Sequence, residues 1–478
     1  MILSVAEGRH AVELITSINH DQMLLYDLIQ KNRELKFIDA QTGNTVPIQA
    51  FHQSLRIDNR QGLVFLYNDN LIGSVEVLLN FLNSRFTLVL LSAQLHPSFK
   101  QDLEELYTPY YIYDASRAAI DAYNTATVSA TIKLFRREKP VEYLIHSNIK
   151  MLLSTSGTTG SPKFVKLSDE HLVQNALSIL DYMPIKNDDV VPLNVPIVFV
   201  YGLSIFTTNC MAAGTIVCTD KDILQPAFWT DFTQYHCSTI GGVPYVYEML
   251  HRIGFFKKEH PSLRYMTQTG GILNQALRNE IVKYSAAYNK QFFAQYGQTE
   301  AAGRMAYLPQ EDLLTKAASI GKPIKNGRFE IDAETSELIY YGPNVFGGYA
   351  NSTANLSTWH ATDTLYTGDV AQQDEDGYYY ITGRIKRIIK LFGTRLNLDE
   401  VELILKNALG GQTVVCTGIN DKYLLVSHVN DQLQEDAVKQ VLKEKLNIHP
   451  ASVQVKYIPS MPLTPNGKID YSTIMQTA

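Results

Sequence analysis

The sequence has no uninterrupted hydrophobic run long enough to cross a membrane. Its most apolar region, residues 190–218, is broken by prolines, a glycine and asparagines at positions 192, 194, 196, 202 and 209. These breaks exclude a lipid-spanning helix and favour a buried strand, a turn and a helix of a globular core. The first twenty residues also lack a basic segment followed by an apolar one, so no secretory signal is predicted and a cytoplasmic location is expected.

Cysteine and basic residues are also sparse or scattered. The four cysteines form no CxxC pair and show no metal-ligand spacing, so we expect reduced, mostly buried thiols. The net charge is −6 and no long basic run occurs, which argues against nucleic acid as the main partner. Hydrophobic residues make up 45% and charged residues 19% of the 478, which is typical of a globular protein with a large core.

Apolar runs of strand length alternate with segments of helical spacing, and this pattern predicts an α/β architecture with a parallel sheet. The expected strands lie at residues 62–68, 86–92, 110–114, 190–195 and 214–218, and the expected helices at 72–82, 97–106, 169–180 and 203–212. Ser168 is expected to cap the helix that follows it. No internal repeat or low-complexity segment interrupts the pattern.

The last ninety or so residues form a separable unit. After the charged segment GRIKRIIK, residues 413–429 resemble a β-hairpin, residues 435–446 a polar helix and residues 452–458 a strand. We therefore expect a small α+β unit at the end of the chain.

The loop STSGTTGSPK, residues 154–163, has the composition of a phosphate-binding segment. Glycines permit a close approach of the backbone, while hydroxyls, backbone N–H groups and a lysine can surround phosphate oxygens. A Walker A loop is excluded, because Pro162 precedes the lysine and Phe164 stands where a Mg²⁺-binding Ser or Thr is required. A flexible surface linker is the simpler alternative, but linkers rarely sit between a buried strand and a helix.

Together with the other motifs, this loop resembles the adenylate-forming superfamily of acyl-CoA synthetases, luciferases and the adenylation domains of peptide synthetases. The further motifs, in chain order, are GGVPYVYEML from Gly241, QTGGIL from Gln268, AQYGQTEAAGRM from Ala294, SELIYYGPNVFGGYA from Ser336, YTGDV from Tyr366 with TGRIK and LFGTR after it, and LTPNGKID from Leu463. The resemblance covers roughly residue 62 to the end. It implies a large N-terminal domain of mostly parallel sheets and helices, residues 1–385, and a small mobile α+β domain, residues 386–478.

The reaction that this resemblance implies is the ATP-dependent conversion of a carboxylic acid into an acyl-adenylate, with Mg²⁺ as the metal. This activation is needed because a carboxylate resists attack by a thiol until it carries a good leaving group. The implied metal ligand is Glu300, and the implied catalytic residues are Lys468, Thr299 and Glu300. The implied nucleotide-binding residues are Thr155, Ser156, Gly157, Thr158, Thr159, Gly160, Lys163, Gly270, Gly271, Tyr296, Gly297, Gln298, Thr299, Asp369 and Arg384.

The implied substrate pocket contains Phe199, Tyr201, Val243 and Gly271. Many acyl-CoA synthetases have a histidine where this chain has Phe199, and amino-acid-activating domains often have an aspartate nearby. Because Phe199, Val200 and Tyr201 offer no carboxylate for a substrate ammonium, the sequence favours an uncharged acyl or aryl acid over an α-amino acid.

The C-terminal motifs imply a second step that follows a domain rotation. By resemblance, Lys386 is the hinge, Gly393 lies on the loop that enters the site for thiolation, and Lys468 acts during adenylation. The expected acceptor is a phosphopantetheine thiol, on CoA or on an acyl or peptidyl carrier protein. Two alternatives stay open at this point: a non-thiol acceptor, as in luciferases, and a catalytically silent protein of the same fold.

Overall fold

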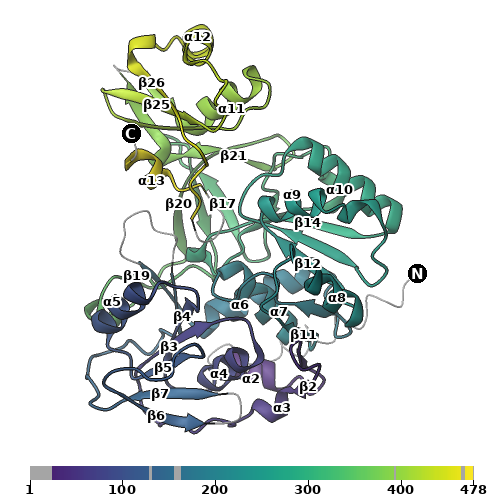
Figure 1. Cartoon of the computed structure of the whole chain (residues 1–478), viewed down its shortest axis with the longest axis vertical. Coiled ribbons are helices and arrows are strands. Elements are labelled where there is room, and N and C mark those ends of the chain that lie inside the picture. The colour runs from purple at the N-terminus through teal and green to yellow at the C-terminus, as the bar shows by residue number, and fades with distance from the viewer. Residues whose placement is uncertain (1–23, 129–131, 155–162, 392–393, 465–468, 477–478) are drawn as a thin grey trace. The chain divides into compact units, whose positions relative to one another are not determined.

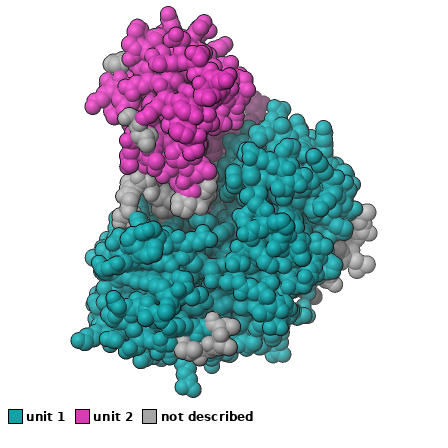
Figure 2. All heavy atoms as spheres, in the orientation of Figure 1, with its two compact units in different colours: residues 1–155, 161–328, 341–365 teal, residues 156–160, 329–340, 366–478 magenta. Residues whose placement is uncertain are grey.

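The computed structural model describes residues 24–128, 132–154, 163–391, 394–464 and 469–476. These residues form two compact units, which Figure 2 distinguishes by colour. Unit 1 comprises the described parts of residues 1–155, 161–328 and 341–365, and unit 2 those of residues 329–340 and 366–478. The predicted boundary at residue 385 separates a large domain from a small domain that rotates, and it stays a prediction.

An eight-stranded sheet forms the first layer of unit 1, in the order β19-β9-β8-β4-β3-β5-β7-β6. Its centre is parallel, as the alternating pattern predicted: β3 (Leu63–Asn68) lies between β4 (Thr87–Ser92) and β5 (Tyr111–Asp114), and β4 also pairs with β8 (Met151–Ser154). The outer strands are antiparallel: β9 (Phe164–Leu167) with β19 (Tyr349–Ala350) at one edge, and β7 (Lys133–Arg137) with β6 (Tyr123–Val128) at the other. All six residues of β3 are buried, which explains its continuous apolar sequence.

The helices that follow the first strands begin and end close to their expected positions. They are α4 (Ile72–Leu82) and α5 (Pro97–Tyr107), while α6 (Asp169–Tyr182) begins after Ser168, whose hydroxyl accepts a hydrogen bond from the backbone N–H of His171. Phe164 is fully buried, with its ring edge-on to Tyr107 at 5.3 Å between centroids. The position that excluded a Walker A loop is therefore a core position of strand β9.

Two further sheets complete unit 1. One has the order β10-β11-β1-β2, with β10 (Val190–Pro192), β11 (Thr215–Cys218), β1 (Lys36–Asp39) and β2 (Thr45–Pro47). The other has the order β12-β13-β14-β15-β16, with β12 (Thr239–Gly242), β13 (Tyr265–Gln268), β14 (Gln291–Tyr296), β15 (Ala306–Leu308) and β16 (Lys322–Pro323). The first three strands of the latter are parallel, so their carboxyl ends lie at one edge of the sheet.

Helices cover these sheets. Helix α9 (Pro244–Arg252) packs on β12 and helix α10 (Gln275–Tyr288) on β14, as Figure 1 shows. Helix α7 (Val200–Met211) packs against α6 and β11. Residues 190–218 thus form a strand, a helix and a strand of the core, as expected, and all four cysteines are buried and unpaired. No helix within the described ranges is long and apolar enough to cross a membrane.

Unit 2 contains most of a four-stranded sheet, in the order β17-β18-β20-β21, and the C-terminal α+β elements. The sheet strands are β17 (Arg328–Ile331), β18 (Glu337–Tyr341), β20 (Thr364–Gln373) and β21 (Tyr379–Arg384), followed by the hairpin of β22 (Ile388–Leu391) and β23 (Thr394–Asn397). The predicted hairpin is confirmed as β24 (Val414–Ile419) and β25 (Tyr423–His428), and β26 (Val453–Tyr457) pairs parallel to β25. Helices α11 (Leu398–Ala408) and α12 (Glu435–Leu446) cover this sheet, and α12 has the expected bounds.

Candidate functional site

The carboxyl ends of β12, β13 and β14 bring three of the predicted motifs to one sheet edge. Val243 follows β12, Gly270 and Gly271 follow β13, and Gly297 follows β14. Gly270 has a φ of +83°, which favours glycine, and a side chain built there would have its Cβ 3.2 Å from Cγ1 of Val243. The predicted nucleotide and substrate segments therefore lie together, at the edge where open α/β sheets commonly bind ligands.

A very close backbone approach closes the loop after β14. A Cβ atom on Gly297 would lie 2.2 Å from the carbonyl oxygen of Gly303, so no larger residue fits there without moving the backbone. The N–H of Gly303 donates to the carbonyl of Gln298 at 3.1 Å, and the N–H of Met305 donates to the carbonyl of Tyr296 at 2.9 Å. The loop thus returns directly into β15, with the 3₁₀ turn η3 (Thr299–Ala301) at its far end.

Glu300 is held within this loop by a tyrosine that we did not single out from the sequence. The Tyr349 hydroxyl donates to Oε1 of Glu300 at 2.9 Å, and burial with the nearby Glu300 carboxylate raises the pKa of Tyr349. The Lys163 ammonium lies 3.2 Å from the centre of the Tyr349 ring, a cation–π contact. Tyr349 therefore brings together the predicted metal ligand and the lysine of the phosphate loop. Its place in the motif GGYA was the only signal in the sequence.

The donor set suits Mg²⁺ only if ATP supplies further ligands. Within the described ranges, no group of three or more His, Cys, Asp and Glu side chains could hold a metal ion by itself. Mg²⁺ in ATP-dependent enzymes is commonly bound through one or two carboxylates together with substrate phosphates and water. A single carboxylate at Glu300, which shares the partner Tyr349 with Lys163 of the predicted phosphate loop, fits that requirement.

In unit 2, the predicted ribose contacts Asp369 and Arg384 lie opposite each other on β20 and β21. Nε of Arg384 is 2.8 Å from Oδ1 of Asp369. The Asp369 side chain is only 2% exposed whereas that of Arg384 is 59% exposed, so the guanidinium bridges the buried carboxylate to the surface. The preceding Gly368 has a φ of +71°, a turn conformation that suits glycine.

Of the predicted substrate-pocket residues, Tyr201 has the most definite position. Phe199 precedes helix α7 and is half-buried, whereas Tyr201 in its first turn is buried. The Tyr201 hydroxyl donates to the carbonyl of Thr267 at 2.8 Å and accepts from the N–H of Gly242 at 3.2 Å. It therefore ties α7 to the ends of β12 and β13, and it has a structural role besides any contact with substrate.

Arg304 and Gln295 are site residues that we did not predict. Gln295 immediately precedes Tyr296, and Arg304 follows Glu300 by four positions. Arg304 is only 2% exposed, and its Nε donates to Oε1 of Gln295 at 2.8 Å. The signal for Arg304 in the sequence was that it is the single charged residue in the stretch AAGRM.

Several predicted residues cannot be placed. Thr155, Ser156, Gly157, Thr158, Thr159 and Gly160 of the phosphate loop, Gly393 and Lys468 lie outside the described residues. Lys386 is described by its backbone alone, in the 3₁₀ turn η6 (Ile385–Arg387) between β21 and β22. Tyr296 ends β14 and Gln298 precedes η3, both half-buried.

Residues 63–350 match the model of a protein family described as AMP-binding enzyme. The chain belongs to this family. The match contains the predicted phosphate loop, the three loops at the sheet edge and Tyr349, and it confirms the resemblance drawn from the motifs. Asp369 and everything after it lie beyond the matched segment.

Relatives of this AMP-binding enzyme include the probable CoA ligase CCL9 of Humulus lupulus, which is 26% identical over 399 residues, covering 76% of this chain and 75% of the relative. The oxalate–CoA ligase of Arabidopsis thaliana is 25% identical over 346 residues, covering 68% and 67%. Among solved structures, the o-succinylbenzoate CoA synthetase of Bacillus subtilis with its acyl-adenylate intermediate gives a TM-score of 0.74 at 18% identity, covering 95% of this chain and 98% of that one. This likeness confirms the fold class, an α/β enzyme with a large N-terminal and a smaller C-terminal domain.

The close backbone approach at Gly297 predicts that any side chain at this position lowers the stability of the protein. We expect Gly297→Ala to lower the free energy of unfolding by about 1–3 kcal/mol, because the methyl group must displace the backbone at Gly303. Gly214→Ala is the control: its Cβ would lie no closer than 3.2 Å to any neighbouring atom, so its loss should be smaller. Urea denaturation of both variants measures the difference, and equal midpoints would show that the loop yields easily.

Proposed function

We propose that this AMP-binding enzyme is an ATP-dependent acid–CoA ligase. It activates a carboxylic acid as an acyl-adenylate, releases pyrophosphate, and then transfers the acyl group to the thiol of CoA. The observation that carries this proposal is the family match over residues 63–350, joined to relatives named as CoA ligases that align with two thirds or more of the chain. A carrier-protein thiol is the other acceptor of the same chemical kind.

In this proposal different site residues bind different parts of the ATP molecule. The phosphate loop, Thr155–Gly160 with Lys163, surrounds the phosphates, and Thr299 contacts the α-phosphate. Tyr296 lies against the adenine, and Gly270 and Gly271 form the close wall beside the nucleotide. Gly297 and Gln298 are further nucleotide-binding residues, while Asp369 and Arg384 bind the ribose. Support comes from the contact of Lys163 and Glu300 with Tyr349 and from the pairing of Arg384 with Asp369.

In the first step, a carboxylate oxygen of the acid attacks the α-phosphorus of ATP. The bond between the α-phosphorus and the bridging oxygen breaks, and pyrophosphate leaves with the electron pair. Bound Mg²⁺ neutralises phosphate charge, and Glu300 is the residue that would hold it. The protein contributes by fixing the reactants in line and by placing positive groups where charge shifts, for which Lys163 and Lys468 are proposed.

In the second step, the thiolate sulfur of CoA attacks the acyl carbonyl carbon. The bond between this carbon and the phosphate oxygen of AMP breaks, and AMP leaves with the electron pair. We propose that residues 386–478 rotate about Lys386 between the two steps, and that the loop with Gly393 then admits the pantetheine arm. The proposed acid carries no α-ammonium group, because Phe199, Val200 and Tyr201 provide no counter-charge.

The function is tested by supplying ATP, Mg²⁺ and a panel of acids, first without and then with CoA. Acid-dependent exchange of labelled pyrophosphate into ATP reports the first step, and thioester formation reports the second. Exchange without any thioester, on CoA or on a phosphopantetheine carrier, would point to a non-thiol acceptor. Absence of exchange with every acid class, including the twenty amino acids, would favour a catalytically silent protein.

The role of Glu300 predicts a large loss of the first step when its charge is removed. Glu300→Gln keeps the size of the side chain and its contact with Tyr349 but weakens metal binding. Acid-dependent ATP–pyrophosphate exchange should fall by roughly two to three powers of ten, the effect of losing one electrostatic stabiliser. Glu311→Gln, an exposed glutamate on the turn η4 (Gln310–Asp312), is the matched control and should exchange at the normal rate. Normal exchange in Glu300→Gln would rule out the metal assignment.

The role of Lys468 predicts an effect on adenylation alone. Lys468→Ala should slow acyl-adenylate formation by roughly two to three powers of ten, about 3–4 kcal/mol, because an ammonium shielded from water stabilises the charge that moves onto phosphate. Thiolation of a supplied acyl-adenylate should stay near normal. Lys445→Ala, an exposed lysine of helix α12, is the control for a general loss of charge. An equal fall in both half-reactions would contradict this division of roles.

A further inference from the structure

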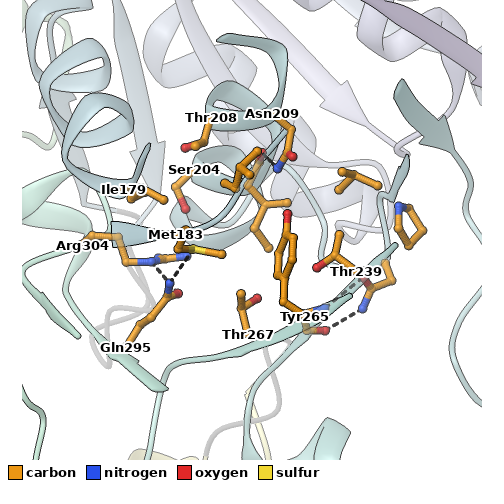
Figure 3. Close-up of a pocket in the computed structure, with 16 residues that line it drawn as sticks. Ile179, Met183, Ser204, Thr208, Asn209, Thr239, Tyr265, Thr267, Gln295 and Arg304 are labelled. Atoms are coloured by element: carbon orange, nitrogen blue, oxygen red, sulfur yellow. Dashed lines mark hydrogen bonds between the residues drawn. The ribbon is translucent and has the colours of Figure 1, made fainter. Parts of the chain in front are cut away.

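A small cavity lined by both apolar and polar side chains lies inside unit 1 beside Arg304. Its walls come from helices α6 and α7 and from the strands β10, β12, β13 and β14. Figure 3 shows Arg304 and Gln295 along one side of it, with Thr208 and Asn209 on α7. The polar side chains among the lining residues include Ser204, Thr208, Asn209, Thr267, Gln295 and Arg304. The space has room for about one to two water-sized groups.

Arg304 is a buried cation whose partners are all neutral. Besides its bond to Gln295, its Nη1 donates to the carbonyl of Gly303 at 2.9 Å, and the guanidinium carbon lies 4.6 Å from the centre of the Tyr201 ring. Burial lowers the pKa of Arg304, and the groups that oppose this shift are the hydroxyls of Tyr182 and Tyr201. In the described parts of the chain, no carboxylate forms an ion pair with this guanidinium. Buried charges are normally paired, so a neutral surrounding is a cost that a bound anion would remove.

Three other buried side chains in the cavity wall have unused hydrogen-bonding atoms: those of Thr208, Asn209 and, through its hydroxyl, Tyr265. Oγ1 of Thr208 and Oδ1 of Asn209 form no hydrogen bond within the described structure, although Thr208 is 0% and Asn209 2% exposed. Nδ2 of Asn209 donates to the carbonyl of Ile205 at 2.9 Å, so its oxygen is the atom left over. Most buried polar atoms have a partner, and atoms without one in a cavity wall point to a ligand or to water. The Thr208 hydroxyl can donate to an anion, whereas the Asn209 oxygen is an acceptor that a donor such as water would satisfy.

Several residues that line the cavity are neighbours in the sequence of the segments assigned to nucleotide and acid. Gln295 immediately precedes Tyr296, Arg304 lies four residues after Glu300, and Thr267 lies at the end of β13 before Gly270. The apolar side chains of Ile179 and Met183 also line it. A group in this cavity would therefore be the far end of a short acid, with apolar walls along its carbon chain.

We propose that the cavity binds a second carboxylate, so that the preferred substrate is a short dicarboxylic acid of which one end is activated. This inference rests on the proposed adenylation. The planar guanidinium can donate two parallel hydrogen bonds to a carboxylate, and the Thr208 hydroxyl offers a further donor. An acid with an apolar tail leaves these buried groups unpaired, and sites built for a polar group discriminate strongly against ligands that lack it. The sequence favoured an uncharged acid because the residues near Phe199 offer no carboxylate that could pair with a substrate ammonium. Arg304 instead offers a positive charge, which can pair with a substrate carboxylate.

The test compares acids in pairs of equal carbon number: succinate with butyrate, glutarate with pentanoate, and, as an aromatic pair, phthalate with 2-methylbenzoate. We expect kcat/KM for pyrophosphate exchange to favour the better dicarboxylates over their monocarboxylate partners by roughly a hundredfold or more. Arg304→Met, which keeps the length and removes the charge, should abolish this preference mainly through KM. Arg304→Lys should keep part of it. Arg252→Met, an exposed arginine at the end of α9, should change nothing.

A second variant and a binding measurement keep the result interpretable. If Arg304→Met does not fold, Thr208→Val should lower the preference by a smaller factor without touching the cation. If the wild-type protein exchanges pyrophosphate with monocarboxylates as well as with dicarboxylates, the inference fails while the proposed function stands. If no acid supports exchange, calorimetric binding of succinate, glutarate and phthalate decides: binding that Arg304→Met loses supports the inference, and no binding to the wild type overturns it.

Discussion

The backbone contact between Gly297 and Gly303 sets the geometry on which the rest of the site depends. With no side chain between them, the chain leaves β14, makes the turn at Thr299–Ala301 and re-enters the sheet as β15 within a few residues. This tight loop holds Glu300 against Tyr349 on one side and sends Arg304 into the interior on the other. Because sheet pairing fixes both ends of the loop, neither side chain has to be positioned by long-range contacts alone.

The two charged residues of this loop, Glu300 and Arg304, have different environments. Glu300 remains half-buried, with the Tyr349 hydroxyl on one oxygen, and the ammonium of Lys163 lies over the ring of the same tyrosine. Arg304 is enclosed by neutral groups and an aromatic face. A half-exposed carboxylate is suited to share a metal with phosphates, whereas an enclosed cation is suited to one complementary anion. The electrostatics are therefore consistent with the proposed nucleotide end at Glu300 and the proposed acid end at Arg304.

Much of this arrangement was predictable because local signals agreed with the fold. The parallel core followed from the alternation of strand and helix patterns, and α4 and α12 have the predicted bounds because their spacing and ends are unambiguous. The antiparallel outer strands β9 and β19 were not predicted, since pairing between residues almost two hundred positions apart leaves no local pattern. For the same reason the contacts of Tyr349 with Glu300 and Lys163 came from the structure alone. Arg304 belongs to a predicted motif but its burial was not predicted, because burial of a cation depends on neighbours from α6 and α7 that the sequence does not place.

The short loop also has a consequence for how this enzyme can change its substrate. The segment from Gly297 to Arg304 contains both the proposed metal ligand, Glu300, and part of the wall of the proposed acid cavity. In this proposal, a mutation there that reshapes the cavity also disturbs the residue that binds the metal. Helix α7 contributes Ser204, Thr208 and Asn209 to the same cavity from a separate part of the chain. New specificities are therefore more accessible, to evolution and to protein engineering alike, through α7 than through the loop that faces it.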